Sequence, residues 1–299
     1  MSDYPNTPEG KRAKPAKTGG AIWKVLVVCA ALAAAVGGWM VYQDILAQQA
    51  LPPEPITFSY RDLTLQAKEG VPVNTLGKDN FFQDEQGRTQ YEQGTQRARQ
   101  GIDVSFYQGE IDWLAVAQDG VEFAIIRLGY RGYTEGGLRM DSRFEENIQG
   151  ALAVGIEVVV YFFSQAITPQ EAREEAQFVL QAIEGYDVSS PVVFDWEVIT
   201  PGNDARTDGL DGQTLTQCAL AFCQEIERAG YTPLVYFNQD LAYLTYDLSQ
   251  MTQYSFWLAE YNPVPNFYYS FDLWQYTHTG TVAGIEGSVD WNLDLRPIQ

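Results

Sequence analysis

One short segment constrains the fold of this chain more than any other: Pro191 to Glu197, with the sequence Pro-Val-Val-Phe-Asp-Trp-Glu. An apolar run opened by a proline is typical of a strand buried on both faces, as in a parallel sheet. Side chains alternate along a strand, so Asp195 and Glu197 point to the same side. A carboxylate buried without partners is unstable, so the pair must meet solvent, a cation or a ligand. A solvated strand end is the plainer interpretation, but such ends also carry the catalytic groups of α/β barrels.

The region after Gly101 alternates between predicted strands and helices, which indicates a parallel sheet. The chain has 299 residues, of which 45% are hydrophobic, enough to bury one large core. Helices are predicted mainly in the first half of this region, over 141–154, 168–183 and 214–229. We therefore predict an α/β fold, a closed TIM-like barrel. Its eight strands are Ile102–Ser105, Phe123–Gly129, Glu157–Phe163, Val192–Glu197, Leu234–Asn238, Phe256–Tyr261, Leu273–Thr277 and Val289–Leu293.

The N-terminal region predicts a membrane anchor. Residues 1–20 form a basic tail, which we expect to be cytoplasmic, and 21–42 form a transmembrane helix. The 18 residues from Val25 to Tyr42 carry no charge and would span roughly 27 Å as a helix. A cleaved signal peptide, giving a secreted protein, is the alternative. We favour the uncleaved anchor, since the apolar run is long, and expect a single-pass membrane protein with its large domain outside the cell.

Residues 43–100 are expected to form a linker and a small accessory β segment. The linker begins with Pro52-Pro53-Glu54-Pro55. Alternation over 56–60 predicts a strand, and residues 81–91 predict a hairpin around Glu85-Gln86-Gly87. The sequence indicates no chemistry for this segment. The barrel is then expected to occupy residues 101–299.

Composition narrows the ligand class. The net charge is −20, and residues 43–299 carry 37 acidic and 14 basic residues. This domain should repel nucleic acid, so none is expected as a partner. Cys29, Cys218 and Cys223 give no disulfide framework, and the last two are expected to pack in the core. His278 is the single histidine and no cysteine cluster lies near it, so we expect no zinc site, no other metal and no cofactor.

Four acids stand at ends of predicted strands. In a closed parallel barrel, the carboxyl ends of all strands meet at one mouth. The first and eighth strands become neighbours on closure, so Asp103 and Asp290 should lie side by side, with Asp195 and Glu197 across the mouth. Each acid alone could be a helix cap or a loop ligand. The set of four predicts a catalytic site.

Aromatic residues occur on the same strands, and each taken alone is more simply a core residue. A cleft that combines acids with several aromatic rings suits a carbohydrate, whose C–H faces pack on rings while its hydroxyls bond to polar groups. The candidate substrate-binding residues are Tyr161, Tyr236, Trp257, Tyr261, Trp274 and Tyr276.

An ordered set of motifs resembles glycoside hydrolase family 25, the Chalaropsis-type lysozymes or N-acetylmuramidases. The likeness runs from about Gly101 to Leu295. The motifs are Gly101-Ile102-Asp103-Val104-Ser105 with Tyr107-Gln108-Gly109 and Ile111-Asp112-Trp113, then Phe123-Ala124-Ile125-Ile126-Arg127, Asp195-Trp196-Glu197, Trp257-Leu258-Ala259-Glu260-Tyr261, Trp274-Gln275-Tyr276 and Gly287-Ser288-Val289-Asp290-Trp291-Asn292.

The resemblance implies an irregular barrel of five β/α units followed by three strands, as the spacing also indicates. It implies cleavage of the β-1,4 bond between N-acetylmuramic acid and N-acetylglucosamine, with peptidoglycan glycan strands as the partner. Glu197 is expected to be the general acid, because crowding by Asp195 should raise its proton affinity. The resemblance implies that Asp195 either orients the substrate's N-acetyl group or assists water. Asp103 and Asp290 then hold the sugar and tune the pair.

Two departures concern substrate detail. A histidine is common in this family near Phe106 and near Phe162, and this chain has neither. Two other functions stay open at this point. One is a non-catalytic glycan-binding barrel in the cell wall. The other is a magnesium-dependent phosphodiesterase that uses the acids as oxygen ligands, although basic residues for a phosphate are sparse.

Overall fold

A computed structural model describes residues 19–49, 55–188, 191–199 and 204–296. Contacts divide the chain into two compact units, residues 1–67 and 68–299. The predicted tail at 1–20 and the linker start at Pro52 fall largely outside the described residues.

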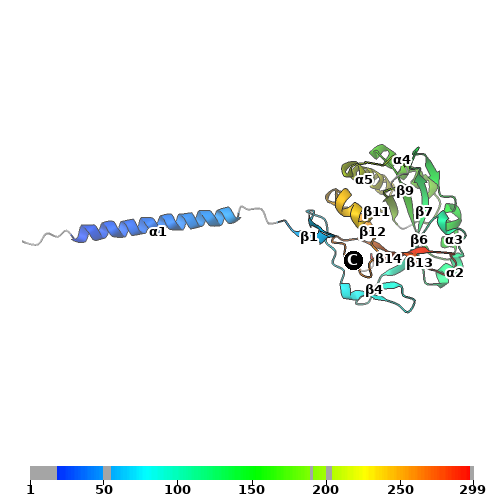
Figure 1. The fold of residues 1–299 in the computed structure, drawn as a ribbon, viewed down its shortest axis with the longest axis horizontal. Coiled ribbons are helices and arrows are strands. Elements are labelled where there is room, and N and C mark those ends of the chain that lie inside the picture. The colour runs from blue at the N-terminus through cyan, green and yellow to red at the C-terminus, as the bar shows by residue number, and fades with distance from the viewer. Residues whose placement is uncertain (1–18, 50–54, 189–190, 200–203, 297–299) are drawn as a thin grey trace, which may run out of the picture. The chain divides into compact units, whose positions relative to one another are not determined.

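The described residues of the first unit, 19–49 and 55–67, form a long helix and a hairpin (Figure 1). Helix α1 spans Gly19–Gln49, and within it Trp23–Asp44 is long and apolar enough to cross a membrane, with its side chains exposed. Strand β1 (Thr57–Tyr60) pairs antiparallel with β2 (Leu63–Gln66). An N-terminal apolar helix is thus present, as the charge-free run predicted, and its length suits either an anchor or a signal.

The second unit contains the predicted barrel of eight strands. All eight lie within a few residues of their expected positions, and the pairing of β6 with β7 closes the barrel. The order around the barrel is β6 (Arg99–Val104), β7 (Phe123–Arg131), β9 (Glu157–Ser164), β10 (Val192–Trp196), β11 (Pro233–Asn238), β12 (Ser255–Ala259), β13 (Leu273–Gly280) and β14 (Val289–Asp294).

The prediction of an all-parallel barrel was wrong for its last strand. The last strand, β14, runs antiparallel to both β13 and β6, because the connection from β13 is too short for a helical crossover. Its first residues therefore lie at the same end as the carboxyl ends of the other strands. Asp290, near the start of β14, reaches the mouth for this reason.

Helices cover the outside of the strands (Figure 1). The long ones begin where the sequence provides caps: Thr168 accepts a hydrogen bond from the Glu171 amide ahead of Pro169, and Asp211 accepts one from Thr214. The helices are α2 (Trp113–Gln118), α3 (Phe144–Ala153), α4 (Pro169–Ala182) and α5 (Gly212–Arg228), with a π-helical turn at Leu241–Thr245 and 3₁₀ turns at Phe106–Gln108 and Leu248–Gln250. Helix α2 and the short strand β8 (Leu138–Met140) were not predicted.

The interior of the barrel is a packed layer of inward-facing side chains. It contains Phe123, Ile125, Val159, Val193, Leu234, Tyr236, Trp257, Ala259 and Leu273. Cys218 and Cys223 are buried in α5 as free thiols, as predicted. The core is therefore closed beneath the mouth rather than open as a pore.

The accessory segment packs on the barrel through a small sheet. The hairpin predicted around Glu85-Gln86-Gly87 is present, and β3 (Phe81–Gln83), β4 (Thr89–Gln93) and β5 (Gln96–Arg97) form an antiparallel sheet after a 3₁₀ turn at Lys78–Asn80. Phe81 contacts Trp274 edge to face at 5.4 Å, and Gln100 Nε2 donates to the Thr89 carbonyl at 2.7 Å. Residues 68–97 thus share one compact unit with the barrel.

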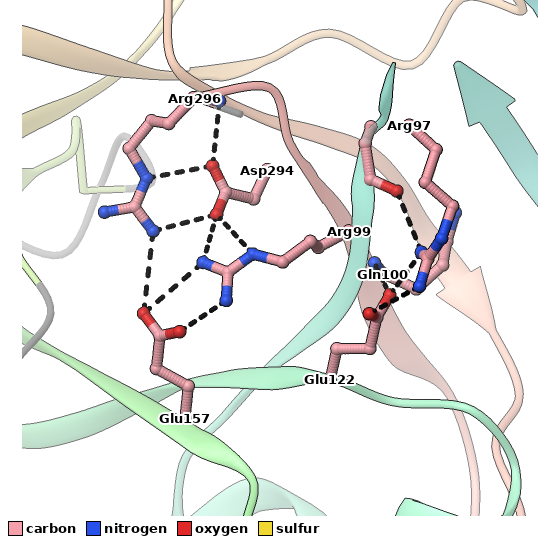
Figure 2. Close-up of polar contacts among 8 residues, drawn as sticks. Arg97, Arg99, Gln100, Glu122, Glu157, Asp294 and Arg296 are labelled. Carbon is pink, nitrogen blue, oxygen red and sulfur yellow. Dashed lines mark hydrogen bonds and ion pairs between the residues drawn. The ribbon is translucent and has the colours of Figure 1, made fainter. Parts of the chain in front are cut away.

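An ionic network closes the opposite end of the barrel, where β6 and β9 begin and β14 ends (Figure 2). Arg99 donates to both Asp294 and Glu157, and Arg296 donates to Asp294 from Nε at 2.9 Å. Arg97 forms a two-pronged pair with Glu122, both bonds being 2.8 Å. We call Arg99, Glu157, Asp294 and Arg296 the floor network.

Candidate active site

A cleft of about 540 Å³ opens at the carboxyl ends of the parallel strands. All four predicted acids line it, together with four of the six predicted aromatic residues, namely Tyr161, Tyr236, Trp257 and Tyr261. We call Asp103, Asp195, Glu197 and Asp290 the mouth acids. The structure thus brings together residues that are nearly two hundred positions apart in the sequence.

Strand register explains why these acids point inward. Val193 is in the barrel core, so Asp195, two residues later on β10, continues the same face. Asp103 pairs in register with Ile125, another core residue. Glu197 follows the last residue of β10 and is only half-buried. The alternation that builds the core therefore also carries the acids to the mouth.

Asp103 and Asp290 lie side by side, as predicted. They are register partners across the antiparallel β6 and β14, and Gln275 Nε2 donates to Oδ2 of each at 3.0 Å. Asp103 also accepts from Asn292 Nδ2 at 2.7 Å. Burial and the charge of Asp290 raise the pKa of Asp103 well above its usual value, and these hydrogen bonds offset only part of the shift.

The two amides that bond to Asp103 are themselves held in place. Gln275 Oε1 accepts from the Tyr261 hydroxyl at 2.8 Å, and Asn292 Oδ1 accepts from Trp257 Nε1 at 2.8 Å. This fixes which amide atom faces the acid, because each oxygen is already occupied by a donor. The sequence reasoning did not select Gln275 or Asn292, although both lie inside the quoted motifs.

Asp195 is a mouth acid whose burial is little offset by hydrogen bonds. Its side chain is buried, and within the described part of the chain its Oδ1 has no hydrogen-bond partner. Burial, then the charges of Glu197 and Asp103, raise its pKa well above the usual range. Burial and the charge of Asp290 also raise the pKa of Glu197. Among the described residues none of the mouth acids forms an ion pair, so their mutual repulsion favours the protonated forms.

Arg127 is a cationic residue that lines the cleft, and sequence reasoning did not assign it a role. It pairs through Nε with buried Asp141 at 2.7 Å. Its Nη2 is buried and has no partner among the described residues. Its charge lowers the pKa of Asp195 but does not overcome burial. A basic residue inside a strand otherwise rich in apolar residues was the available signal.

Exposed aromatic rings form the rim of the cleft. Tyr107 and Tyr133 line it, and both are exposed. Phe106 and Tyr107 each lie against the Arg127 guanidinium, at 4.9 and 5.3 Å from the ring centroids. Phe106 lies near one of the two places where the resembled family commonly has a histidine, and Phe162 lies near the other. Phe162 is fully buried.

Trp274 and Tyr276 do not line the cleft. Trp274 is fully buried and donates from Nε1 to the Glu260 carbonyl at 2.7 Å. The Tyr276 hydroxyl donates to Gln100 Oε1 at 3.1 Å, and its ring lines a different groove. They share a face of β13, as expected, but this face points to the accessory sheet, because Gln275 takes the inward position.

The described part of the chain offers no set of metal ligands. There, no group of three or more His, Cys, Asp or Glu side chains is arranged so that it could hold a metal ion. His278 packs its ring against Tyr261 at 4.5 Å, and its charge lowers the pKa of Asp290 relative to the effect of burial alone.

Comparison with known proteins identifies a family. The family model described as glycosyl hydrolases family 25 matches residues 102–285. An autolytic lysozyme of Clostridium acetobutylicum is 28% identical over 191 residues, covering 64% of this chain and 54% of that protein. Lysozyme M1 of Streptomyces globisporus is 30% identical over 205 residues, covering 64% of this chain and 66% of that protein. This chain therefore spans about half the length of the first relative.

Solved structures share the fold. The modular autolysin LytC of Streptococcus pneumoniae, solved in complex with a synthetic peptidoglycan ligand, is 26% identical, with a TM-score of 0.58 over 72% of this chain and 52% of that chain. A family 25 glycosyl hydrolase of Bacillus anthracis is 21% identical, with a TM-score of 0.56 over 69% of this chain and 92% of that chain. The second likeness is evidence for the fold alone.

Proposed function

This chain belongs to the glycosyl hydrolases of family 25, and from that premise we propose that it is a lysozyme. Its substrate is the glycan strand of peptidoglycan, and it hydrolyses the β-1,4 bond between N-acetylmuramic acid and N-acetylglucosamine. The names of the relatives support this substrate. The observation that carries the proposal is the set of four mouth acids in one cleft, without ion pairs among the described residues.

The proposed mechanism assigns proton donation to Glu197. Burial and the charge of Asp290 raise its pKa, which favours the protonated carboxyl, and it stands at the open edge of the cleft, where a glycosidic oxygen has access. The proton passes to the leaving oxygen as the bond from the anomeric carbon breaks. Water then supplies hydroxide to the anomeric carbon and returns a proton to the carboxyl pair.

Asp195 acts on the anomeric side of the same bond. It either orients the substrate's N-acetyl group, whose oxygen attacks, or assists the water. Its unpartnered Oδ1 is available for either contact. Asp103 and Asp290 hold the sugar and raise the proton affinity of the pair. Tyr161, Tyr236, Trp257 and Tyr261 supply ring faces and hydroxyls around the bound sugar. No metal or cofactor enters this scheme.

The domain organisation is part of the proposal. A cytoplasmic tail over 1–20, a transmembrane anchor over 21–42 and a linker with an accessory segment over 43–100 would present the barrel of 101–299 to the cell wall. The exposed apolar helix supports the anchor. Within the barrel, α2 to α5 and the turn at Leu241–Thr245 support five β/α units followed by three strands.

Product analysis tests the activity. The full chain in detergent micelles is incubated with purified peptidoglycan, and the fragments are analysed by mass spectrometry after reduction of new ends. A lysozyme yields new reducing ends on muramic acid. New ends on glucosamine would instead show a glucosaminidase, and binding without cleavage would show the non-catalytic glycan-binding barrel.

A further inference from the structure

A second groove, of about 760 Å³, lies beside the cleft. One of its walls is formed by residues outside the range that the family model matches. That wall is the accessory hairpin, including Gln83 and Gln86. The facing wall is the outer end of β13 with the loop that follows it, including Thr279 and Thr281. The groove therefore exists only because the accessory sheet packs against the barrel.

The groove and the cleft meet at one residue. Tyr261 lines both, is half exposed, and is held by its hydroxyl bond to Gln275 and by the ring of His278. A ligand that passes over Tyr261 would thus leave the mouth acids and enter the groove. An exposed, fixed aromatic ring at this junction is a suitable surface for a sugar ring.

The groove wall is fixed rather than loose. Asp84 accepts hydrogen bonds from the Gln86 and Arg88 amides, which sets the hairpin turn. Arg88 donates to the carbonyl and the carboxylate of Asp119 at 2.6 and 2.7 Å and lies 4.3 Å from the Trp291 ring centroid. A site held in advance loses little entropy when it binds its ligand.

The two charged side chains that line the groove, Arg88 and Asp119, pair with each other. Exposed side chains around them include the amides of Gln83, Gln86 and Asn262 and the hydroxyls of Thr279 and Thr281. Such groups suit the hydroxyl and N-acetyl groups of amino sugars.

We propose that this groove is a second glycan-binding site, which holds the peptidoglycan strand beyond the sugars bound in the cleft. The inference rests on the proposed lysozyme function and assigns a role to residues 81–88. The enzyme would then cleave long strands with a lower KM than short fragments, because only long strands reach the groove.

The test compares substrates of two lengths. The Gln83→Ala/Gln86→Ala double variant removes two exposed amides from the groove, and Gln96→Ala removes an exposed amide from the same sheet away from it. The full chain in detergent is assayed on a peptidoglycan tetrasaccharide and on long glycan strands freed of peptides. We expect the double variant to raise KM on long strands roughly fivefold, with KM on the tetrasaccharide and kcat unchanged. The Gln96→Ala control should match the wild type on both substrates.

Binding separates this proposal from the catalytic one. In a Glu197→Gln background, which lacks the proposed acid, the Kd for long strands should rise by the same factor in the double variant. Equal affinities for long strands with and without the two glutamines would overturn the groove proposal even if the enzyme cleaves normally. An equal loss on both substrate lengths would also overturn it, because the effect would then lie in the cleft. Failure of the wild type to cleave, with length-dependent binding intact, would instead overturn the lysozyme function alone.

Discussion

Buried carboxylates have pKa values shifted in opposite directions at the two ends of the barrel. At the floor network, Asp294 is buried, yet hydrogen bonds and charges from Arg296 and Arg99 outweigh burial and hold its pKa below the usual value (Figure 2). At the mouth, burial dominates and the pKa of every one of the four acids is raised. Carboxylates thus stabilise the fold at the floor network and repel one another at the mouth.

The difference separates a structural task from a catalytic one. Paired acids stay charged and fix strands in place, whereas crowded acids without counterions share protons that they can give to a substrate. The floor joins the starts of β6 and β9 to the end of β14. The mouth acids lie at the other ends of β6 and β14 and at the end of β10.

The largest expected effect is on activity. Glu197→Gln should reduce kcat by about 10²–10⁴, since the amide cannot donate a proton to the leaving oxygen. The melting temperature should not fall. The matched control is Glu122→Gln, which breaks the pair with Arg97 at the floor end and should leave kcat unchanged. Wild-type turnover in pure Glu197→Gln protein would remove Glu197 from the mechanism.

The next effect is on stability. Asp294→Asn should lower the free energy of unfolding at pH 7 by about 3 kcal/mol, because it leaves Arg99 and Arg296 without their shared carboxylate. Since the folded pKa of Asp294 is depressed, its contribution is present above the unfolded value of about 3.9 and lost as pH falls below it. Urea unfolding at neutral and acid pH measures both. Equal stability of variant and wild type at pH 7 would contradict the role of the floor.

The same substitution at the mouth should have the opposite sign. Asp195→Asn should raise the free energy of unfolding at pH 7 by about 1 kcal/mol while activity falls. The raised pKa of Asp195 means that its charge costs stability as pH rises from the unfolded value of about 3.9 towards the folded one. The gain should therefore vanish at acid pH. A loss of stability at neutral pH would show that the negative charge of the mouth acids is better stabilised than the structure indicates.

The smallest effect concerns Arg127. Arg127→Gln removes the charge that lowers the pKa of Asp195, so the acidic limb of the kcat/KM profile should move to higher pH, with less than about a tenfold loss at the optimum. Arg127→Lys keeps the charge and should keep the limb in place. Identical shifts in both variants would attribute the effect to the lost pair with Asp141 instead.

Most of the barrel could be predicted from the sequence, because buried strands appear as apolar runs with two-residue periodicity. The direction of β14 could not, since its apolar pattern is the same whichever way the strand runs. Asp103, Asp195, Glu197 and Asp290 were found because acids at strand ends are conspicuous.

The remaining parts of the site depend on three-dimensional contacts. Gln275 and Trp274 are adjacent on one strand, and only its register shows that the glutamine faces the cleft and the tryptophan the accessory sheet. The Nη2 of Arg127, which has no hydrogen-bond partner in the described part of the chain, and the groove at the accessory hairpin have no local sequence pattern. Both follow from packing between distant segments.

The pH dependence of kcat/KM, measured with excess EDTA, tests the central claim most directly. If the mouth acids share protons and Glu197 donates one, activity is highest at mildly acidic pH and falls as pH rises through the raised pKa of Glu197. EDTA leaves the profile unchanged. Activity that increases through neutral pH, or full inactivation by EDTA with rescue by magnesium, would contradict the account and make the four acids metal ligands.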